Sequence, residues 1–468
     1  MKKSILSMIL ISLPVIMLSG CGTATGSGAG AGNDTGSAPE STQESAAETE
    51  AGTEQESAAE TEAGTEQESA AETEAGTEQE TEAEAETAPE AVAEEKTEEM
   101  KQAINEFSRK LYDEYGNEDN LFFSPFSICS AIALSDLAAN GETAEGINEA
   151  LSIKDFEAFK EEMKGFYHKE QKESAYFKSA NGLFIDKDLK LSPDYEEKFV
   201  KPAREYFDGE FRQVDFGDTD NVKKEITAWV NDATEGMISD YQAGADKNTV
   251  ADILNAVYFY GEWQHSFSHN DTFEETFHGK NKDTETEMMH KDDVTLPYFS
   301  DENGLKAVAL PYKDSSYEMD LIMYADPEKK DLTAVFQELS PSDVLEKLDN
   351  AEETELGSLV IPKFKQDLTL NGLKEVLRKL GMEAAFSGSA DFSNLSENLT
   401  ISDISHRAMV EVDEEGSRAA AVTEIMMGLT ALPYDEPKEE FIADRPFVYI
   451  IRDRESGVIL FMGRYTEP

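Results

Sequence analysis

A 12-residue unit, ESAAETEAGTEQ, occurs three times in succession at residues 44–55, 56–67 and 68–79. The unit has no large apolar side chain, so a stack of such units has nothing to bury and cannot offset the entropy lost on ordering. The flanking residues within 22–96 have the same character, with 21 acidic residues and a single lysine over that range. We therefore predict that residues 21–96 form a disordered, self-repelling tether, and that any folded domain follows it.

The remaining residues, 97–468, hold nearly all of the Phe, Tyr, Leu and Ile and are long enough to bury a large core. The whole chain has 98 acidic and 41 basic residues, a formal charge of −57. Proteins that bind nucleic acid or anionic lipid do so through clustered basic charge. The charge therefore rules out a nucleic-acid binder that acts through phosphate neutralisation, and it argues against electrostatic docking on anionic lipid.

The N-terminus has the features of an export signal. Lys2 and Lys3 precede an apolar run that is too short to span a membrane, which is typical of a secretory signal peptide. The run ends in Leu18-Ser19-Gly20-Cys21, which resembles the bacterial lipobox, in which the cysteine is lipidated and becomes the mature N-terminus. The resemblance implies a signal peptide at residues 1–20 and an acyl anchor on Cys21. The alternative is an ordinary signal peptide with an incidental cysteine.

Helical periodicity dominates the first third of residues 97–468, and alternating strand patterns dominate the rest. An extended segment at 120–128 precedes a helix that ends at Ala139, and Thr143 is expected to cap the next helix. The other predicted helices are 98–115, 155–175, 222–238 and 370–380. The predicted strands are 180–185, 211–216, 251–260, 286–290, 295–300, 305–311, 319–324, 358–364, 407–412, 447–451 and 458–465. This order predicts an α+β fold with large mixed or antiparallel sheets.

Motifs for metal, nucleotide or nucleophilic chemistry are missing from the sequence. It contains no His-Glu-x-x-His, Cys-x-x-Cys, Walker loop or Rossmann glycine pattern. His265 and His269 could share a helix face and bind a metal with Asp271, but two surface imidazoles are the simpler interpretation. Cys129 lies in an apolar stretch, which favours a core residue over a nucleophile. We therefore predict no cofactor, no metal and no enzymatic activity, and favour a binding function.

More than thirty residues separate the predicted strands 407–412 and 447–451, a length that is typical of a functional loop. Its side chains alternate, and both early charges, Arg418 and Glu424, fall on one face. The uncharged face comprises Ser417, Ala419, Ala421, Thr423, Ile425, Met427 and Leu429. Alternation is typical of a strand with one buried side, yet Ala and Ser are weak strand formers. The segment is thus a loop that can become a strand, or else a solvent loop with chance alternation.

Motifs spread over the domain match those of one known family, in the same order. They are Phe123-Ser124-Pro125-Phe126-Ser127-Ile128, Asn181-Gly182-Leu183-Phe184, Asn255-Ala256-Val257-Tyr258-Phe259-Tyr260-Gly261-Glu262-Trp263, Leu310-Pro311-Tyr312, Ile361-Pro362-Lys363-Phe364 and Asp444-Arg445-Pro446-Phe447. The hinge sequence Glu414-Glu415-Gly416-Ser417-Arg418-Ala419-Ala420-Ala421-Val422-Thr423 is close to the family's Glu-x-Gly-Thr-Glu-Ala-Ala-Ala-x-Thr. From about residue 98 to 468 the chain resembles a serpin. The resemblance implies a serpin fold with a large central mixed β-sheet, further sheets and about eight or nine α-helices.

The resemblance also implies a suicide inhibitor of serine proteases, and in some members of cysteine proteases. A protease cuts the reactive loop, here at about residues 414–440, and the freed hinge inserts into the large sheet before deacylation. Insertion needs small inward side chains, which Ser417, Ala419 and Ala421 provide, while Arg418 replaces the usual Glu on the outward face. A non-inhibitory serpin-fold surface binding protein is the alternative. An unrecognised secreted hydrolase is a third hypothesis that no motif supports.

Family spacing places the cleaved bond after Thr430, sixteen positions beyond Glu414, and before Ala431. The loop is several residues longer than in familiar members, so other apolar residues remain candidates for the position before the cut. They are Met427, Leu429 and Leu432. Residues 419–437 contain no Arg or Lys, which argues against trypsin-like targets and favours elastase-like or chymotrypsin-like ones.

Five further residues match family positions at which the sheet opens. Ser124, Ser127, Asn255 and His406 match the region where the strands part, and Trp263 matches the tryptophan where the loop first enters. A core histidine with satisfied hydrogen bonds is the alternative for His406, and both roles are compatible. Together these features predict an exported monomer, held at a bacterial membrane by its N-terminal lipid, with the inhibitor domain exposed on the outer side.

Overall fold

The computed structural model describes residues 98–468 except 117–119, 235, 237, 240, 242–243, 245, 248, 327–331, 333–334, 398, 403, 405 and 418–437. The predicted signal peptide, Cys21 and the tether lie outside these residues. The described helices are α1 Glu99–Glu114, α2 Pro125–Asp136, α3 Gly141–Leu151, α4 Phe156–Tyr167, α5 Lys201–Phe207, α6 Thr219–Ala233, α7 Val335–Glu338, α8 Pro341–Asp349 and α9 Leu373–Leu377. None of these helices is long and apolar enough to cross a membrane.

Fifteen strands form two sheets in the described part of the chain. The strands are β1 Leu121–Phe123, β2 Ala175–Asp186, β3 Gly209–Val214, β4 Ala251–Glu262, β5 Thr272–His278, β6 Asp283–Ser300, β7 Leu305–Pro311, β8 Tyr317–Tyr324, β9 Glu353–Pro362, β10 Phe364–Leu370, β11 His406–Val412, β12 Gly416–Ser417, β13 Glu439–Ile442, β14 Phe447–Asp453 and β15 Val458–Tyr465. A mixed six-stranded sheet has the order β10-β11-β12-β4-β2-β3, with β2 and β3 parallel. A nine-stranded sheet has the order β1-β15-β14-β8-β7-β6-β9-β13, and β5 pairs with β6.

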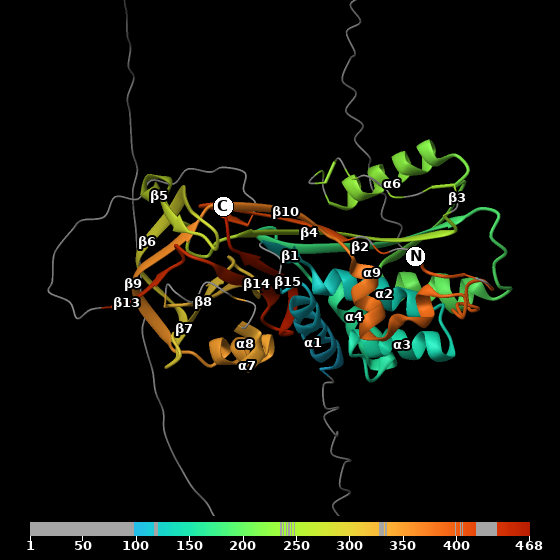
Figure 1. Ribbon diagram of the computed structural model, residues 1–468, viewed down its shortest axis with the longest axis horizontal. Coiled ribbons are helices and arrows are strands. Elements are labelled where there is room, and N and C mark those ends of the chain that lie inside the picture. Colours follow the sequence, from blue (N-terminus) through green and yellow to red (C-terminus); the bar gives the residue numbers. More distant parts are fainter. Residues whose placement is uncertain are drawn as a thin grey trace, which may run out of the picture. The chain divides into compact units, whose positions relative to one another are not determined.

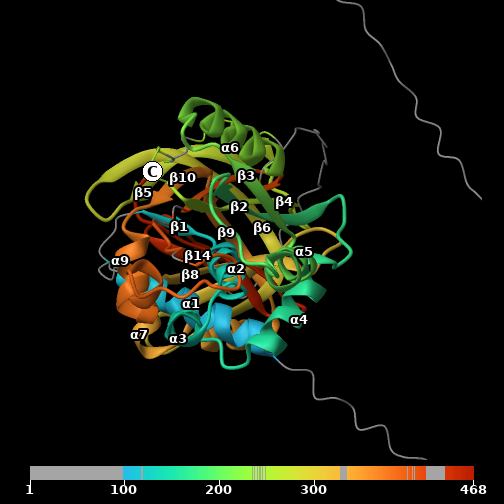
Figure 2. The same ribbon diagram turned by 90° about the vertical axis from the view of Figure 1, so that its right-hand side faces the viewer.

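The six-stranded sheet lies between helices. Figure 1 shows α6 on one side of β2 and β4, and α1 to α4 on the other, and the turned view agrees (Figure 2). Val257 and Phe259 of β4 pack in the main core, whereas Leu254 and Ala256 pack in a smaller cluster with Trp229 of α6. The side chains of β4 therefore alternate between two buried layers. The predicted α+β architecture, with a large mixed sheet and about eight or nine helices, is confirmed.

Three central elements are buried on all sides, so their sequences lack the one-sided apolar pattern of an amphipathic helix or strand. Every residue of α2 is buried, as are all those of β14 and β15, which explains their near-continuous apolar sequences. The prediction of an extended segment to residue 128 was wrong, because α2 begins at Pro125. Ser124 is its N-cap and accepts a hydrogen bond from the Ser127 amide (3.1 Å), and proline suits the first helical position.

Other predicted ends of helices and strands were also wrong, because contacts with distant parts of the chain decide them. Thr143 lies inside α3 rather than capping it, and its hydroxyl accepts a hydrogen bond from the Asp391 amide (2.9 Å). The helix predicted for 155–175 ends at Tyr167. The two strands predicted within 286–300 are a single strand, β6, because pairing with β5 and then β9 carries it through its charged middle. Sequence patterns missed α5, α7, α8 and β5 altogether.

Candidate functional site

The two-residue strand β12 lies between β11 and β4 in the six-stranded sheet. Ser417 pairs with Val412 on one side and with Gly261 on the other. A tight turn delivers it there: the Asp413 carboxylate accepts hydrogen bonds from the amides of Glu415 (2.9 Å) and Gly416 (3.2 Å). The beginning of the predicted hinge is thus already a strand of the sheet.

Both neighbouring strands, β11 and β4, continue beyond the residues that pair with β12. Among the described residues no ladder pair joins β11 directly to β4, and both strands pair only with β12 on their facing edges. Both are antiparallel to β12, so they run parallel to each other. A small cavity adjoins Ser417 on this line, and it is lined by Phe122, Phe259, Met409, Val410, Glu411, Ser417, Ile451 and Phe461.

Glycine is required where β12 meets β4. A Cβ atom on Gly416 would lie 1.9 Å from the carbonyl oxygen of Gly261, a distance no side chain tolerates. The glycine in the hinge motif therefore permits close backbone approach, which is a steric requirement rather than one of backbone angles.

The side chain of Glu414 anchors the turn and is buried, with 3% of its surface exposed. Its Oε1 accepts a hydrogen bond from Thr272 Oγ1 (2.9 Å) and lies 3.2 Å from His269 Nδ1, and Lys363 Nζ lies 3.1 Å from its Oε2. Burial by itself would raise the pKa of Glu414. Hydrogen bonds from its own backbone, Thr272, Lys363 and His269 outweigh burial and hold the pKa below its usual value. The carboxylate therefore stays ionised.

Trp263 contacts the turn that leads into β12. Its indole nitrogen donates a hydrogen bond to the Asp413 carbonyl (2.9 Å), and its amide donates to the Glu415 carbonyl (2.8 Å). Its ring stacks on Tyr312 at 4.6 Å with an interplanar angle of 10°. Tyr312 in turn shares a hydrogen bond with Ser417, since the two hydroxyl oxygens are 2.6 Å apart. Sequence reasoning quoted Tyr312 only as part of a motif and gave it no role.

His406 begins β11, at the end of that strand away from β12. Its Nε2 accepts a hydrogen bond from the Ser124 amide (3.0 Å), and the Ser124 hydroxyl donates to the Leu460 carbonyl (2.6 Å). Burial lowers the pKa of His406 to about 3, so the ring is neutral at physiological pH. His406 is therefore a buried, neutral histidine with a hydrogen bond to Nε2, and its proposed function where the sheet opens stays a prediction.

Ser127 and Asn255 belong to a separate polar network under β2 and β4. The Ser127 hydroxyl donates to the Asn255 side-chain oxygen, and the Asn255 amide donates to Ser179 Oγ (3.0 Å) and Asn181 Oδ1 (2.8 Å). The structure thus brings together Ser124 with His406, and Ser127 with Asn255. Sequence analysis did not single out Ser179 or Asn181, although Asn181 lies in one of the family motifs.

The described chain resumes at Lys438, beyond the loop. Lys438 Nζ lies 2.5 Å from Asp293 Oδ1 and 3.1 Å from Glu355 Oε1, and these hydrogen bonds raise its pKa to about 12. The following strand β13 pairs in parallel with β9. The hinge residues Arg418, Ala419, Ala420, Ala421, Val422 and Thr423 and the predicted cleaved pair Thr430 and Ala431 lie outside the described residues.

The described residues contain neither a metal-binding cluster nor a reactive thiol. No three His, Cys, Asp or Glu side chains converge there in a way that could hold a metal ion. His265 and His269 do not share a helix, since His269 opens the short 3₁₀ turn His269–Asp271 and contacts Glu414. Cys129 is fully buried in α2, and burial raises the pKa of its thiol, so it is an inert core residue.

Comparisons with a family model and with related sequences identify the same family. The model of the serpin family, described as serine protease inhibitors, matches residues 102–468. A serpin-like protein of Thermococcus kodakarensis is 35% identical over 375 residues, covering 78% of this chain and 85% of its own. The leukocyte elastase inhibitor of Xenopus laevis is 32% identical over 373 residues, covering 77% and 96%.

Solved structures agree with the sequence matches. The native state of the thermophilic serpin tengpin has a TM-score of 0.69 and 26% identity, covering 78% of this chain and 93% of that chain. Human thyroxine-binding globulin in a ligand complex has a TM-score of 0.69 and 25% identity, covering 80% and 100%. The chain therefore belongs to the serpin family of serine protease inhibitors.

Proposed function

We propose that this protein is a cell-surface suicide inhibitor of serine proteases with elastase-like or chymotrypsin-like specificity. The observation that carries the proposal is the register of β12, which starts a strand in the space between β11 and β4. Cleavage of the loop frees residues 418 onward to extend that strand. The added residues gain ladder hydrogen bonds alternately to β11 and to β4, and this pairing supplies free energy to trap the protease.

Extending the register of β12 assigns a partner to each hinge residue. Because Ser417 lies opposite Gly261 and Val412, Ala419 would lie opposite Phe259 and Val410. By the same count Ala421 would lie opposite Val257 and Ala408, and Thr423 opposite Asn255 and His406. Phe259, Val257, Ala408 and Val410 all pack in the main core. The uncharged face of the hinge would therefore be the buried one, and only small side chains would fit beside Phe259.

The outward face of the hinge is also compatible with insertion. In the same register Arg418 would lie opposite Tyr260 and Glu411, on the face away from the main core. Glu411 is 44% exposed, so opposite charges would meet at a solvated surface. The arginine that replaces the usual family glutamate is thus expected to be tolerated.

Specificity is proposed from the loop sequence and the relatives. Residues 419–437 contain no Arg or Lys, and we propose cleavage between Thr430 and Ala431. Four amphibian and mammalian relatives at 32–33% identity are named leukocyte elastase inhibitors. Small or apolar residues before the cut suit the pockets of elastase-like and chymotrypsin-like enzymes.

The decisive experiment mixes the full chain with neutrophil or pancreatic elastase. We expect an SDS-stable complex of one inhibitor and one protease, and a released C-terminal peptide that begins at Ala431 by mass spectrometry. Cleaved protein should melt at a higher temperature than intact protein, since insertion completes the sheet. Turnover of the chain without a complex and without a rise in melting temperature would favour the alternative, a non-inhibitory binding protein of the same fold.

A matched pair of variants tests the proposed burial of one hinge face. Ala421→Glu places a charge in the core on insertion and should convert the inhibitor into a substrate that is cut without forming a complex. Arg418→Glu introduces the same residue on the outward face and should still form the complex. If both variants inhibit equally, the extended register is incorrect.

Attachment to the cell surface is a separate part of the proposal. Cys21 would carry the lipid, and residues 21–96 would hold the domain away from the membrane. Metabolic labelling with an alkyne fatty acid should mark the wild-type chain and the Cys129→Ser control but not Cys21→Ser. Labelling of the Cys21→Ser variant would overturn the anchor at this position.

A further inference from the structure

The hydroxyl of Tyr312 is the only polar side-chain partner that the described structure gives to Ser417. Tyr312 is fully buried and Ser417 is 2% exposed, and their oxygens are 2.6 Å apart. Burial raises the pKa of Tyr312, so the phenol keeps its proton and can donate. Because neither hydroxyl reaches water, removing one leaves the other without a partner in a dry environment.

The tyrosine ring is held from several sides, so its hydroxyl has a fixed position. Trp263 stacks on one face, and Phe259 meets the ring at 4.9 Å and 61°. A Cβ atom on Gly261 would lie 2.5 Å from the ring, so only glycine at this point of β4 leaves room for it. These contacts place the hydroxyl at the one position in β12 whose side chain faces the core.

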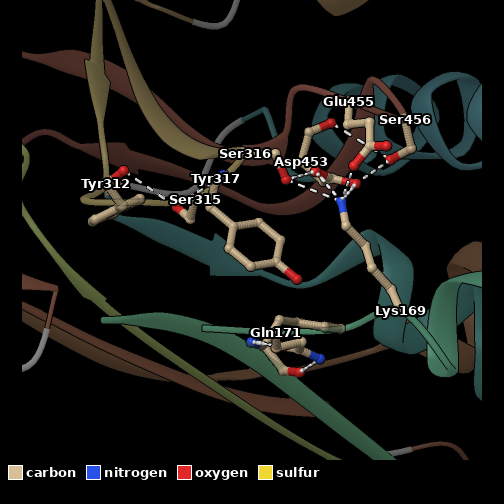
Figure 3. A network of polar contacts seen from close by, with 10 residues as sticks. Lys169, Gln171, Tyr312, Ser315, Ser316, Tyr317, Asp453, Glu455 and Ser456 are labelled. Atoms are coloured by element: carbon tan, nitrogen blue, oxygen red, sulfur yellow. Dashed lines mark hydrogen bonds and ion pairs between the residues drawn. The ribbon is translucent and has the colours of Figure 1, made fainter. Parts of the chain in front are cut away.

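A polar network fixes the turn that carries Tyr312. The Tyr312 amide donates to the Tyr317 carbonyl (3.0 Å), and the Ser315 hydroxyl donates to the Tyr312 carbonyl (3.2 Å). Next to this turn, Ser316 bonds the buried carboxylate of Asp453 (2.5 Å), and Lys169 Nζ lies 2.9 Å from both oxygens of that carboxylate (Figure 3). The turn that carries Tyr312 is therefore attached, through Ser316, to strand β14 and to the segment after α4.

We propose that Tyr312 is a positioning residue for the inhibitory reaction, whose hydroxyl holds Ser417 in the sheet before the loop is cut. This inference rests on the proposed function and adds a residue to it. An inserting strand must order its first residues before it gains a full ladder, and that entropy is a barrier to insertion. With Ser417 already in place, insertion after cleavage starts from a formed pair. The rate at which the acyl-enzyme is trapped then increases relative to the rate at which it is hydrolysed.

The kinetic test measures how many inhibitor molecules are consumed for each protease trapped. Tyr312→Phe and Ser417→Ala should each raise this number about 3- to 10-fold, the effect of one hydrogen bond, while the rate of loop cleavage stays unchanged. The double variant should equal the single variants, since both act through one contact. Ser417→Thr keeps the hydroxyl and should retain the wild-type value. Additive effects in the double variant would overturn the proposal.

Tyr112→Phe is the matched control for general loss of stability. Tyr112 is also fully buried, and its hydroxyl donates to the Leu332 carbonyl (3.0 Å) far from the hinge. This variant should lose stability as Tyr312→Phe does, yet leave the number of inhibitors consumed unchanged. An equal effect of the two variants on that number would show a purely structural role and overturn the proposal.

Hydrogen exchange of the uncut full chain gives a readout that needs no protease. Backbone amides of peptides that include residues 416–417 should exchange about 3- to 10-fold faster in Tyr312→Phe than in wild type or Tyr112→Phe. Unchanged exchange would overturn the proposal. Faster exchange in Tyr312→Phe, combined with a wild-type chain that traps no protease, would support the hydroxyl contact and overturn the inhibitory function it was proposed to serve.

Discussion

The two ends of the reactive loop are held in different ways. At the N-terminal end, Glu414 and Ser417 are almost fully buried and bond to Thr272, Lys363 and Tyr312. At the C-terminal end, Lys438 pairs with Asp293 and Glu355, whose side chains are 68% and 57% exposed.

This difference corresponds to what each end is proposed to do. The N-terminal end must start a new strand in one register, and buried polar bonds define a register because any other leaves them unpaired. The C-terminal end only has to stay attached to β9, and the parallel ladder of β13 with buried Phe441 does this without a specific charge pair. Buried polar contacts thus specify the register at the N-terminal end of the loop, the end that is proposed to insert.

The largest expected difference between the ends is steric. Gly416→Ala should destabilise the native protein by about 3 kcal/mol, because its Cβ would clash with the Gly261 backbone. Gly357→Ala, at the other end, brings its Cβ 3.0 Å from the Cβ of Lys438, a contact that a small shift of that residue relieves, so its cost should stay below about 1 kcal/mol. Thermal and denaturant unfolding of both variants compares the ends directly, and equal losses would remove the distinction.

A smaller effect is expected from removing the charge at each end. Glu414→Gln leaves Lys363 without its buried partner and should cost about 2 kcal/mol, with faster hydrogen exchange at residues 416–417. Lys438→Gln removes a pair with exposed carboxylates and should change stability much less. If Lys438→Gln proves as costly as Glu414→Gln, the C-terminal end is also held by specific polar contacts.

The two ends should release at opposite extremes of pH. The folded pKa of Glu414 is below its usual 4.5, so its contribution is complete above that pH and is lost as the pH falls through the lower folded value. The folded pKa of Lys438 is raised from 10.5 to about 12, so its contribution is complete below 10.5 and is lost as the pH rises through about 12.

Tryptophan fluorescence can follow the acid release. The chain has two tryptophans, so Trp229→Phe leaves Trp263, which bonds to Asp413 and Glu415, as the only reporter of the hinge. Its emission should stay constant as the pH is lowered to about 5 and change below about 4.5, and Glu414→Gln should abolish that change. A transition that survives in Glu414→Gln would be assigned to the adjacent Asp413, because burial raises the pKa of its carboxyl group and its carboxylate accepts hydrogen bonds within the same turn.

The smallest expected effect is that of salt. Raising NaCl from about 0.05 to 0.5 M screens exposed pairs far more than buried ones. Stability differences between wild type and Lys438→Gln should vanish at high salt, while those between wild type and Glu414→Gln should persist. Urea titrations at both salt concentrations measure this, and an equal loss at both ends would contradict the contrast in burial.

Much of the fold was predictable because it depends on local pattern. The strands at 305–311 and 458–465 match their predictions to the residue, and the helix predicted for 98–115 differs by one residue at each end. Local pattern failed where a partner strand or a cap decides the boundary, as in β6, which continues through Lys291, Asp292 and Asp293. It also missed β5, an edge strand with acidic exposed positions.

The site was predictable only in part. The family motifs identified Ser124, Ser127, Asn255, Trp263 and His406, and the structure places each beside the opening or in its polar support. Their function in opening the sheet stays a prediction, as do the cleaved bond at Thr430 and the lipid at Cys21. Tyr312 was not predictable, because nothing in a Leu-Pro-Tyr motif indicates that its hydroxyl meets a serine 105 residues away.

The sequence by itself determined that residues 22–96 contain almost no large apolar side chains, and that one face of the hinge is uncharged and begins with small side chains. The first property follows from composition and the second from the alternation of side chains along the chain, and both can be seen in a short stretch of sequence. Only the tertiary structure decided that β12 pairs with β11 and β4, and that Glu414 and Ser417 are buried against Lys363 and Tyr312. These contacts join segments far apart in the chain, and the free energy of a buried polar pair depends on the partner that packing brings to it.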